Sequence, residues 1–131
     1  MTQKDKELLI KDLCARLPYK VKLNANYFDF NRDGKLFSIN NNKELILSPE
    51  RGYPFDVAIE KCKPYLFPIS SMTEEATREF NATLEWITTA DGYSESVMTY
   101  DSFDCLNKHH IDYRGLIPKG LAIDATGLNI Y

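Results

Sequence analysis

The stretch from Lys63 to Glu75 constrains the fold of this chain more than any other part of it. Pro64 and Pro68 each disfavour helical geometry at the residue before them, so this stretch is predicted to be extended. Ser71 and Glu74 then form the S-x-x-E pattern that is typical of a capped helix start. Strand and turn patterns dominate before this junction and helical patterns dominate after it. The sequence therefore predicts an α+β fold.

The chain is predicted to form a single domain, because 131 residues with 44% hydrophobic content can bury a substantial core. We divide it into residues 1–62 (a helix plus strands), 63–71 (the proline-rich junction) and 72–131 (mainly helical, with a short C-terminal strand). No apolar run is long enough to span a bilayer, and the charged first residues lack the apolar core of a signal peptide. The expected location is cytoplasmic, without a membrane contact.

The first half predicts one helix followed by an antiparallel meander. Thr2 can cap the helix and Pro18 ends it, and we expect the helix to cover one face of the sheet with an apolar stripe of Leu9, Ile10, Leu13, Cys14 and Leu17. Strict alternation over 19–25 predicts the first strand, 36–39 the return strand and 44–47 a third. The meander thus has three or more strands, and its pattern leaves open whether it forms a small open barrel. Residues 53–62 fit either a short strand or a helical turn.

The second half predicts two helices packed on the sheet. Apolar spacing favours a helix over 72–88, and Asp101 or Ser102 can cap a shorter one that runs through His109. Residues 93–99 carry little pattern and are predicted to form a loop. A compact turn over 114–120 and a short strand over 121–123 follow, and the tail from 124 to 131 is predicted to be loosely held.

Charge is unevenly distributed along the chain. The net charge is −3, yet residues 1–22 carry +3, whereas residues 72–104 hold eight acidic side chains against Arg78 alone. The acidic block is either a solvated helical face or a surface for a basic protein partner. Glu74, Glu75 and Glu79 are its candidate binding residues.

Cys105, His109 and Asp112 form the one pattern that suits a thiolate activated by imidazole, or a pair of metal ligands. On a helix, Cys105 and His109 would share a face. The alternative places Cys105 in the core and His109 and His110 at the negative end of the helix dipole. The chain has only two histidines, its three cysteines include no C-x-x-C pair, and all three thiols are predicted to be buried and reduced. We therefore assign no catalytic residue, metal ion or cofactor from the sequence.

Asp29, Asn31, Asp33 and Gly34 match the opening of a calcium-binding loop. The closing position holds Asn40 where such loops have glutamate, and the flanking residues follow strand patterns. A hairpin turn at 31–34 explains the same residues and is the favoured interpretation.

Two basic segments are further candidates for ligand binding. Arg114 and Lys119 lie in a glycine-containing turn and suit a phosphate or a carboxylate, although the spacing of a phosphate-binding loop is absent. Lys20 and Lys22, beside Tyr19 and Tyr27, suit a single-stranded nucleic acid. The acidic net charge and the absence of an aromatic recognition motif disfavour nucleic acid as a partner.

Three segments resemble a group of short uncharacterised proteins from gut anaerobic bacteria, often found in prophage or mobile-element settings. They are the opening around 12–19, the junction at 63–73 and the C-terminal segment at 106–122. This resemblance implies an accessory protein of a mobile element, and it supplies no activity or site residue.

The leading hypothesis from the sequence is a non-enzymatic protein-interaction module. Single-stranded nucleic-acid binding, and a Cys/His hydrolase or metal site at Cys105, His109 and Asp112, are the alternatives. The sequence specifies neither the partner nor the oligomeric state.

Overall fold

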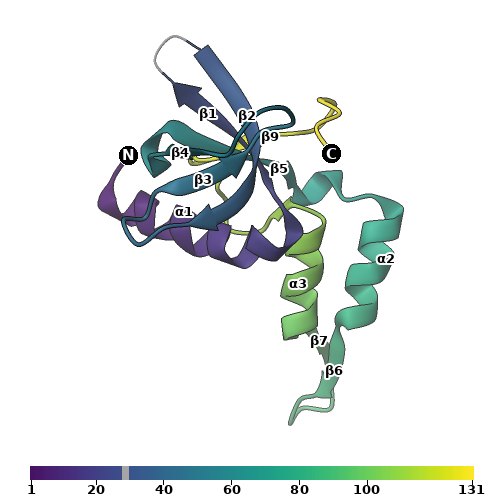
Figure 1. Ribbon diagram of the computed structural model, residues 1–131. Helices are drawn as coiled ribbons and strands as arrows, with labels where there is room; N and C mark the ends of the chain where they lie inside the picture. Colours follow the sequence, from purple (N-terminus) through teal and green to yellow (C-terminus); the bar gives the residue numbers. More distant parts are fainter. Residues whose placement is uncertain (28–29) are drawn as a thin grey trace.

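The computed structural model describes residues 1–27 and 30–131. Its helices are α1 (Gln3–Arg16), α2 (Glu74–Thr83) and α3 (Tyr100–Lys108), with short 3-10 segments η1 (Leu17–Tyr19), η2 (Ile59–Lys61) and η3 (Ile69–Ser71). Its strands are β1 (Lys22–Tyr27), β2 (Phe30–Ile39), β3 (Leu45–Ser48), β4 (Phe55–Val57), β5 (Cys62–Pro68), β6 (Glu85–Thr88), β7 (Ser94–Val97), β8 (Ile111–Asp112) and β9 (Ile123–Asp124). The predicted α+β class is confirmed: an N-terminal helix, a mostly antiparallel sheet and then two helices, with no closed barrel (Figure 1).

Helix α1 lies against one face of the sheet, as its apolar stripe predicts (Figure 1). Thr2 caps it: the Thr2 hydroxyl accepts the Asp5 N–H at 3.1 Å, and the Asp5 carboxylate accepts the Thr2 N–H at 3.2 Å. Leu9 and Leu13 are fully buried in the core beside the strand residues. Cys14, in contrast, is exposed, which corrects the prediction of three buried thiols.

The main sheet has the strand order β4-β3-β2-β1-β5-β8, and β9 also pairs with β5. Strands β1 to β4 form the predicted antiparallel meander, and β4 resolves the ambiguity over 53–62 as a short strand followed by η2. The inward side chains of β1, β2 and β3 complete the core under α1; among them are Leu23, Ala25, Leu36, Leu45 and Leu47.

The predicted hairpin turn at 31–34 is wrong. These residues lie inside β2, where Asn31 pairs with Asn26 and Gly34 pairs with Leu23. The pairing of β1 with β2 continues as far as Tyr27 and Phe30. Gly34 serves a different purpose, since a Cβ placed there would lie 2.9 Å from the Cβ of Leu47. The glycine permits close packing of neighbouring strands.

The part of the proline-rich junction that holds Pro64 and Pro68 lies in the strand β5, so its extended conformation is confirmed there, whereas residues 69–71 form η3. It pairs antiparallel with β1 and parallel with both β8 and β9. The helix start lies slightly later than predicted, because Ser71 lies in η3 and Thr73 is the N-cap of α2, accepting the Ala76 N–H at 3.1 Å.

Helix α2 ends at Thr83, which corrects the predicted helix over 72–88. Residues 85–88 and 94–97 pair instead as the antiparallel hairpin β6–β7, and 94–97 was predicted to be loop. Trp86, Ile87 and Thr88 are aromatic or β-branched and prefer strands, while Gly92 has φ +85° in the connecting turn. The local strand preference thus overrides the continuing helical spacing.

Helix α3 begins after Thr99, not after Asp101 or Ser102. Thr99 also ties α3 to α2, because its hydroxyl donates to the Thr83 carbonyl at 2.9 Å. Its N–H donates to the Ser102 hydroxyl at 2.9 Å, within the capping box of α3. The two helices lie side by side and project away from the sheet, with the β6–β7 hairpin at their far end (Figure 1). Residues 74–108 are hereafter called the arm.

The C-terminal tail is anchored, which corrects the prediction that it is loosely held. The Tyr131 hydroxyl accepts the Lys22 N–H at 2.9 Å and donates to the Tyr65 carbonyl at 2.8 Å. The Lys22 ammonium donates to the Ile130 carbonyl. The last strand is also displaced, since β9 covers 123–124 and not 121–123.

Candidate functional site

Three polar side chains meet on the seam between α2 and α3. Glu79 Oε2 lies 2.6 Å from His109 Nε2, and Glu79 Oε1 accepts a hydrogen bond from Lys108 Nζ at 2.7 Å. Hydrogen bonds from Lys108 and then His109 hold the pKa of the Glu79 carboxyl below its ordinary value. Both carboxylate oxygens of Glu79, a predicted binding residue, therefore already have partners within the protein.

Cys105 completes this cluster from one turn earlier on α3. The Cys105 thiol, a Glu79 carboxylate oxygen and a His109 ring nitrogen all lie within 4.8 Å of one another. Burial, together with the Glu79 carboxylate, raises the pKa of the Cys105 thiol. The thiol is thus kept protonated, which is the opposite of the shift that activates a nucleophilic cysteine.

Asp112 does not join Cys105 and His109. Its carboxylate oxygens accept the backbone N–H groups of Leu116 and Ile117, each at 2.9 Å. The hydrolase pattern of Cys105, His109 and Asp112 is therefore not assembled, and Asp112 instead caps the turn that follows β8. The sequence missed Glu79 as the partner of His109, because the two residues are far apart in the chain and only the packing of α2 on α3 joins them.

Arg114 belongs to a buried charged network and does not point freely to solvent. Asp12 and Arg16 on α1 are fully buried; Arg16 Nε donates to Asp12 Oδ2 at 2.7 Å, and Arg16 Nη2 donates to the Ile111 carbonyl at 2.6 Å. Arg114 Nε lies 3.2 Å from Asp12 Oδ1. This network joins α1 to the segment after α3, while Lys119 is exposed and lies outside it.

His110, which follows α3, packs against the C-terminal tail. Its ring stacks on that of Tyr131 with centroids 3.8 Å apart, and its buried Nδ1 has no hydrogen-bond partner among the described residues. Burial, with the nearby Arg16, His109 and Lys22 charges, lowers the pKa of His110 to about 4. His110 is therefore neutral near pH 7 and does not face the negative end of α3 as a cation.

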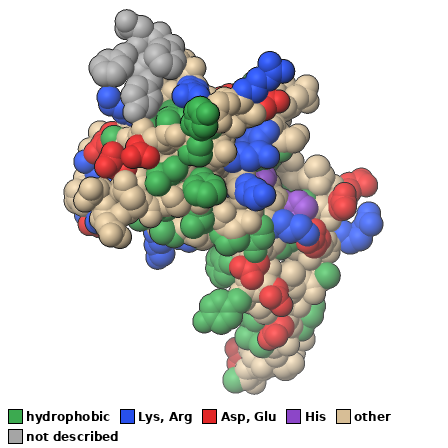
Figure 2. All heavy atoms as spheres, in the orientation of Figure 1, with side chains coloured by type: hydrophobic (Ala, Val, Ile, Leu, Met, Phe, Trp, Pro, Cys, Tyr) green, Lys and Arg blue, Asp and Glu red, His purple; other side chains and the backbone are tan. Residues whose placement is uncertain are grey.

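The exposed end of the arm gathers large apolar side chains. Trp86 is 72% exposed, Tyr93 73% and Tyr100 91%. Ile87, Met98 and Phe103 are exposed beside them in sequence. Figure 2 shows hydrophobic and acidic side chains side by side over this projecting part of the molecule. The sequence marked only the acidic charge of this region and missed its aromatic surface, although the tryptophan and two tyrosines lie within the acidic block.

The acidic side chains of the arm fall into two groups. Glu74 and Glu75 are exposed in the first turn of α2, where negative charge complements the helix dipole. The other group is exposed and lies close in sequence to the exposed aromatic residues; its members are Glu85, Asp91, Glu95, Asp101 and Asp104. No ion pair involves this second group within the described residues, so its charge is open to a partner.

The residues of the calcium-loop pattern do not form a loop where they are described. Asp33 accepts hydrogen bonds from the Tyr65 hydroxyl at 2.8 Å and from Asn24 Nδ2 at 3.0 Å, within the sheet. Asn31 is paired in β2, and Asp29 lies outside the described residues. A calcium loop running from Asp29 to Asn40 is incompatible with the strand that occupies most of it.

Only part of the basic segment that was considered for nucleic-acid binding is available to a ligand. Lys22 is held by the tail, with its ammonium on the Ile130 carbonyl and 5.7 Å from the centroid of the Tyr131 ring. Lys20 is exposed and Tyr19 is half-buried. The side chain of Tyr27 lies outside the described residues.

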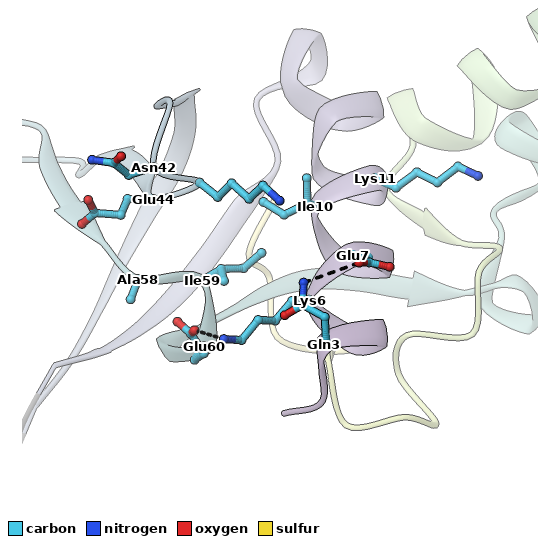
Figure 3. Close-up of a pocket in the computed structure, with 11 residues that line it drawn as sticks. Gln3, Lys6, Glu7, Ile10, Lys11, Asn42, Glu44, Ala58, Ile59 and Glu60 are labelled. Atoms are coloured by element: carbon cyan, nitrogen blue, oxygen red, sulfur yellow. Dashed lines mark hydrogen bonds and ion pairs between the residues drawn. The ribbon is translucent and has the colours of Figure 1, made fainter.

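A cavity of about 580 Å³ lies between α1, the turn after β2 and η2. Figure 3 shows its side chains, with Lys6 directed at Glu60, which is an ion pair, and Gln3 directed at Glu7. Its lining mixes lysine and glutamate side chains, and the Lys6–Glu60 and Gln3–Glu7 pairs already occupy part of the polar groups. It therefore carries no assignment of a ligand.

Within the described residues, no helix is both long and apolar enough to cross a membrane. Comparisons with protein-family models, with curated proteins and with solved structures each find no match. The geometry of the arm is therefore the basis on which a function is proposed.

Proposed function

We propose that this protein is a non-enzymatic interaction module that binds a basic protein segment through the end of its arm. The observation that carries this proposal is the β6–β7 hairpin, in which every strand residue except Val97 is exposed. A two-stranded hairpin is marginally stable in water unless something covers it. Its two open strand edges and its exposed Trp86 are features that a bound partner would bury.

Charge complementarity selects the kind of partner. Five exposed carboxylates that form no ion pair within the described residues lie close in sequence to the exposed aromatic residues, so a segment rich in lysine or arginine would be attracted and oriented there. A second copy of the same arm would bring like charges together, which opposes self-association through this surface. The preferred occupant is a basic extended segment that adds a strand to the hairpin.

The two alternatives are less well supported. The raised pKa of the Cys105 thiol and the separate engagement of Asp112 oppose a Cys–His hydrolase. The engagement of Lys22 by the tail reduces the basic surface on which nucleic-acid binding would depend. The mobile-element setting rests on the sequence resemblance and stays a prediction.

The test uses a peptide array of extended segments of about ten residues, in which lysine alternates with valine, and a matched array with glutamate in place of lysine. We expect the full chain to bind the basic peptides and not the acidic ones, with an affinity that falls as the salt concentration rises. Trp86→Ser should weaken binding about tenfold or more, measured by fluorescence anisotropy. Glu95→Gln should slow association, most strongly at low salt.

Tyr53→Ser is the matched control, because Tyr53 is 88% exposed in the loop before β4, outside the arm. Equal losses in the Trp86 and Tyr53 variants would contradict the proposal. Equal binding of acidic and basic peptides would also contradict it, and so would dimerisation through the arm in sedimentation experiments.

A further inference from the structure

We propose that Glu79, Cys105 and His109 form a binding site for one Zn²⁺-like divalent cation on the seam between α2 and α3. The three side chains supply carboxylate oxygen, thiolate sulfur and imidazole nitrogen, which are the three ligand types that zinc prefers. Their ligand atoms already lie within 4.8 Å of one another. The sequence offered Cys105 and His109 as a pair of metal ligands and did not identify Glu79 as a third, because Glu79 comes from another helix.

The spacing of the ligand atoms fits a tetrahedral ion after small side-chain rotations. Bonds of about 2.0–2.3 Å to zinc place neighbouring tetrahedral ligands about 3.3–3.8 Å apart. The 2.6 Å contact between Glu79 Oε2 and His109 Nε2 must therefore open by about 1 Å as the ion enters. His109 is the C-cap of α3, four residues after Cys105, and its ring nitrogen lies within 4.8 Å of the Cys105 thiol.

The surroundings leave one position for water. Cys105 is buried, whereas Glu79 and His109 are half-buried and partly exposed to solvent. Three protein ligands and one open position are the arrangement of zinc sites that keep a water molecule. Binding requires the Cys105 thiol to lose its proton to solvent, and the ion itself stabilises the resulting thiolate.

Lys108 stands at the edge of this site. Its ammonium lies on Glu79 Oε1, while Oε2 is the oxygen directed at His109. Glu79 can thus bind the ion through one oxygen and keep its hydrogen bond to Lys108 through the other, which orients the ligand. An ion at this seam would join α2 to α3 and hold the arm that carries the β6–β7 hairpin.

The experiment titrates the full reduced chain with Co²⁺, whose absorption reports its ligands, and then displaces it with Zn²⁺. We expect one ion per chain, intense visible bands typical of tetrahedral coordination, and a near-ultraviolet band from thiolate-to-cobalt charge transfer. Cys105→Ser should abolish the charge-transfer band. Glu79→Gln and His109→Gln should each weaken binding about tenfold or more.

Cys14→Ser is the matched control, since Cys14 is an exposed thiol on α1 outside the cluster. Circular dichroism of each metal-free variant establishes that it folds. Should Cys105→Ser fail to fold, protection of Cys105 from alkylation by Zn²⁺ in the parent chain, read by mass spectrometry, replaces it. Absence of binding at millimolar metal would overturn the proposal, and so would loss of the charge-transfer band in Cys14→Ser. Neither result bears on the peptide-binding test, which uses metal-free protein.

Discussion

The side chains that join α1 to the rest of the molecule are charged as well as apolar. Asp12 and Arg16 lie within one turn of α1, and both are completely buried. Most polar atoms of this pair have hydrogen-bond partners: two hydrogen bonds join Arg16 to Asp12, and a third runs from Arg16 to the Ile111 carbonyl. A buried ion pair of this kind is costly to break, because the remaining charge keeps its desolvation penalty without its partner.

Asp12→Ala should therefore lower the free energy of unfolding by about 3–5 kcal/mol in urea denaturation. Asp12→Leu combined with Arg16→Met should recover part of that loss, because Arg16 no longer leaves a buried charge unpaired and only the partly exposed Arg114 loses its ion pair with Asp12. The control is Glu60→Ala, which breaks the solvent-exposed pair with Lys6 and should cost less than about 1 kcal/mol. A cost for Asp12→Ala as small as that of the control would contradict this account.

The strands differ strongly in how far strand pairing and burial protect them from local opening. Strand β5 pairs with β1, β8 and β9, and its Leu66 is fully buried. The hairpin β6–β7 pairs only with itself and has solvent on both faces. Local opening costs little free energy where few buried contacts are lost. The arm therefore combines a firm base, where Thr99 caps α3 and bonds to Thr83, with a loosely held tip.

Amide hydrogen exchange should separate these elements. We expect the β5 amides that donate within the sheet to exchange only through global unfolding, and the β6–β7 amides to exchange at least about a hundredfold faster. Addition of a basic peptide that binds the arm should slow exchange in the hairpin and leave β5 unchanged. Equal protection of the two elements in the free protein would show that the hairpin is covered, contrary to the proposed function.

At the scale of the whole molecule, the C-terminal tail packs against His110, a residue whose protonation links folding stability to pH. His110 packs on Tyr131, with the Arg16 and Lys22 charges nearby, so protonation of its ring is opposed in the folded state. The pKa of His110 is lowered from 6.5 to about 4, whereas in the unfolded chain it regains its ordinary value. Between those values the unfolded state binds the extra proton, so the stabilising contribution is present above pH 6.5 and is lost as pH falls toward 4.

The free energy of unfolding should accordingly decrease as pH is lowered from 6.5 to about 4. His110→Asn should flatten this decrease, since asparagine does not titrate and tolerates the φ of 59° at this position. Urea denaturation at a series of pH values measures both slopes. Carboxylates with lowered pKa, such as Glu79, act in both proteins, so the difference isolates His110. Parallel slopes for parent and variant would refute this role.

Local patterns in the sequence were sufficient to predict much of the fold. The start of α1 at Thr2, its end near Pro18 and the extended junction at Pro64 and Pro68 depend on neighbouring residues, so they could be predicted and are confirmed. The hairpin β6–β7 was missed because helical spacing continued past Thr83 in the sequence. The turn at 31–34 was misplaced because Gly34 looked like a turn residue and is a packing residue.

The sequence by itself determined the α+β class, the core-facing stripe of α1 and the acidic character of the arm, because each depends on spacing along the chain. Tertiary structure decided which distant residues meet. Glu79 reaches His109 and Cys105 only through the packing of α2 on α3, and Arg114 reaches Asp12 only through the approach of the last segment to α1. Such contacts join residues far apart in the chain, and no local periodicity encodes their distance.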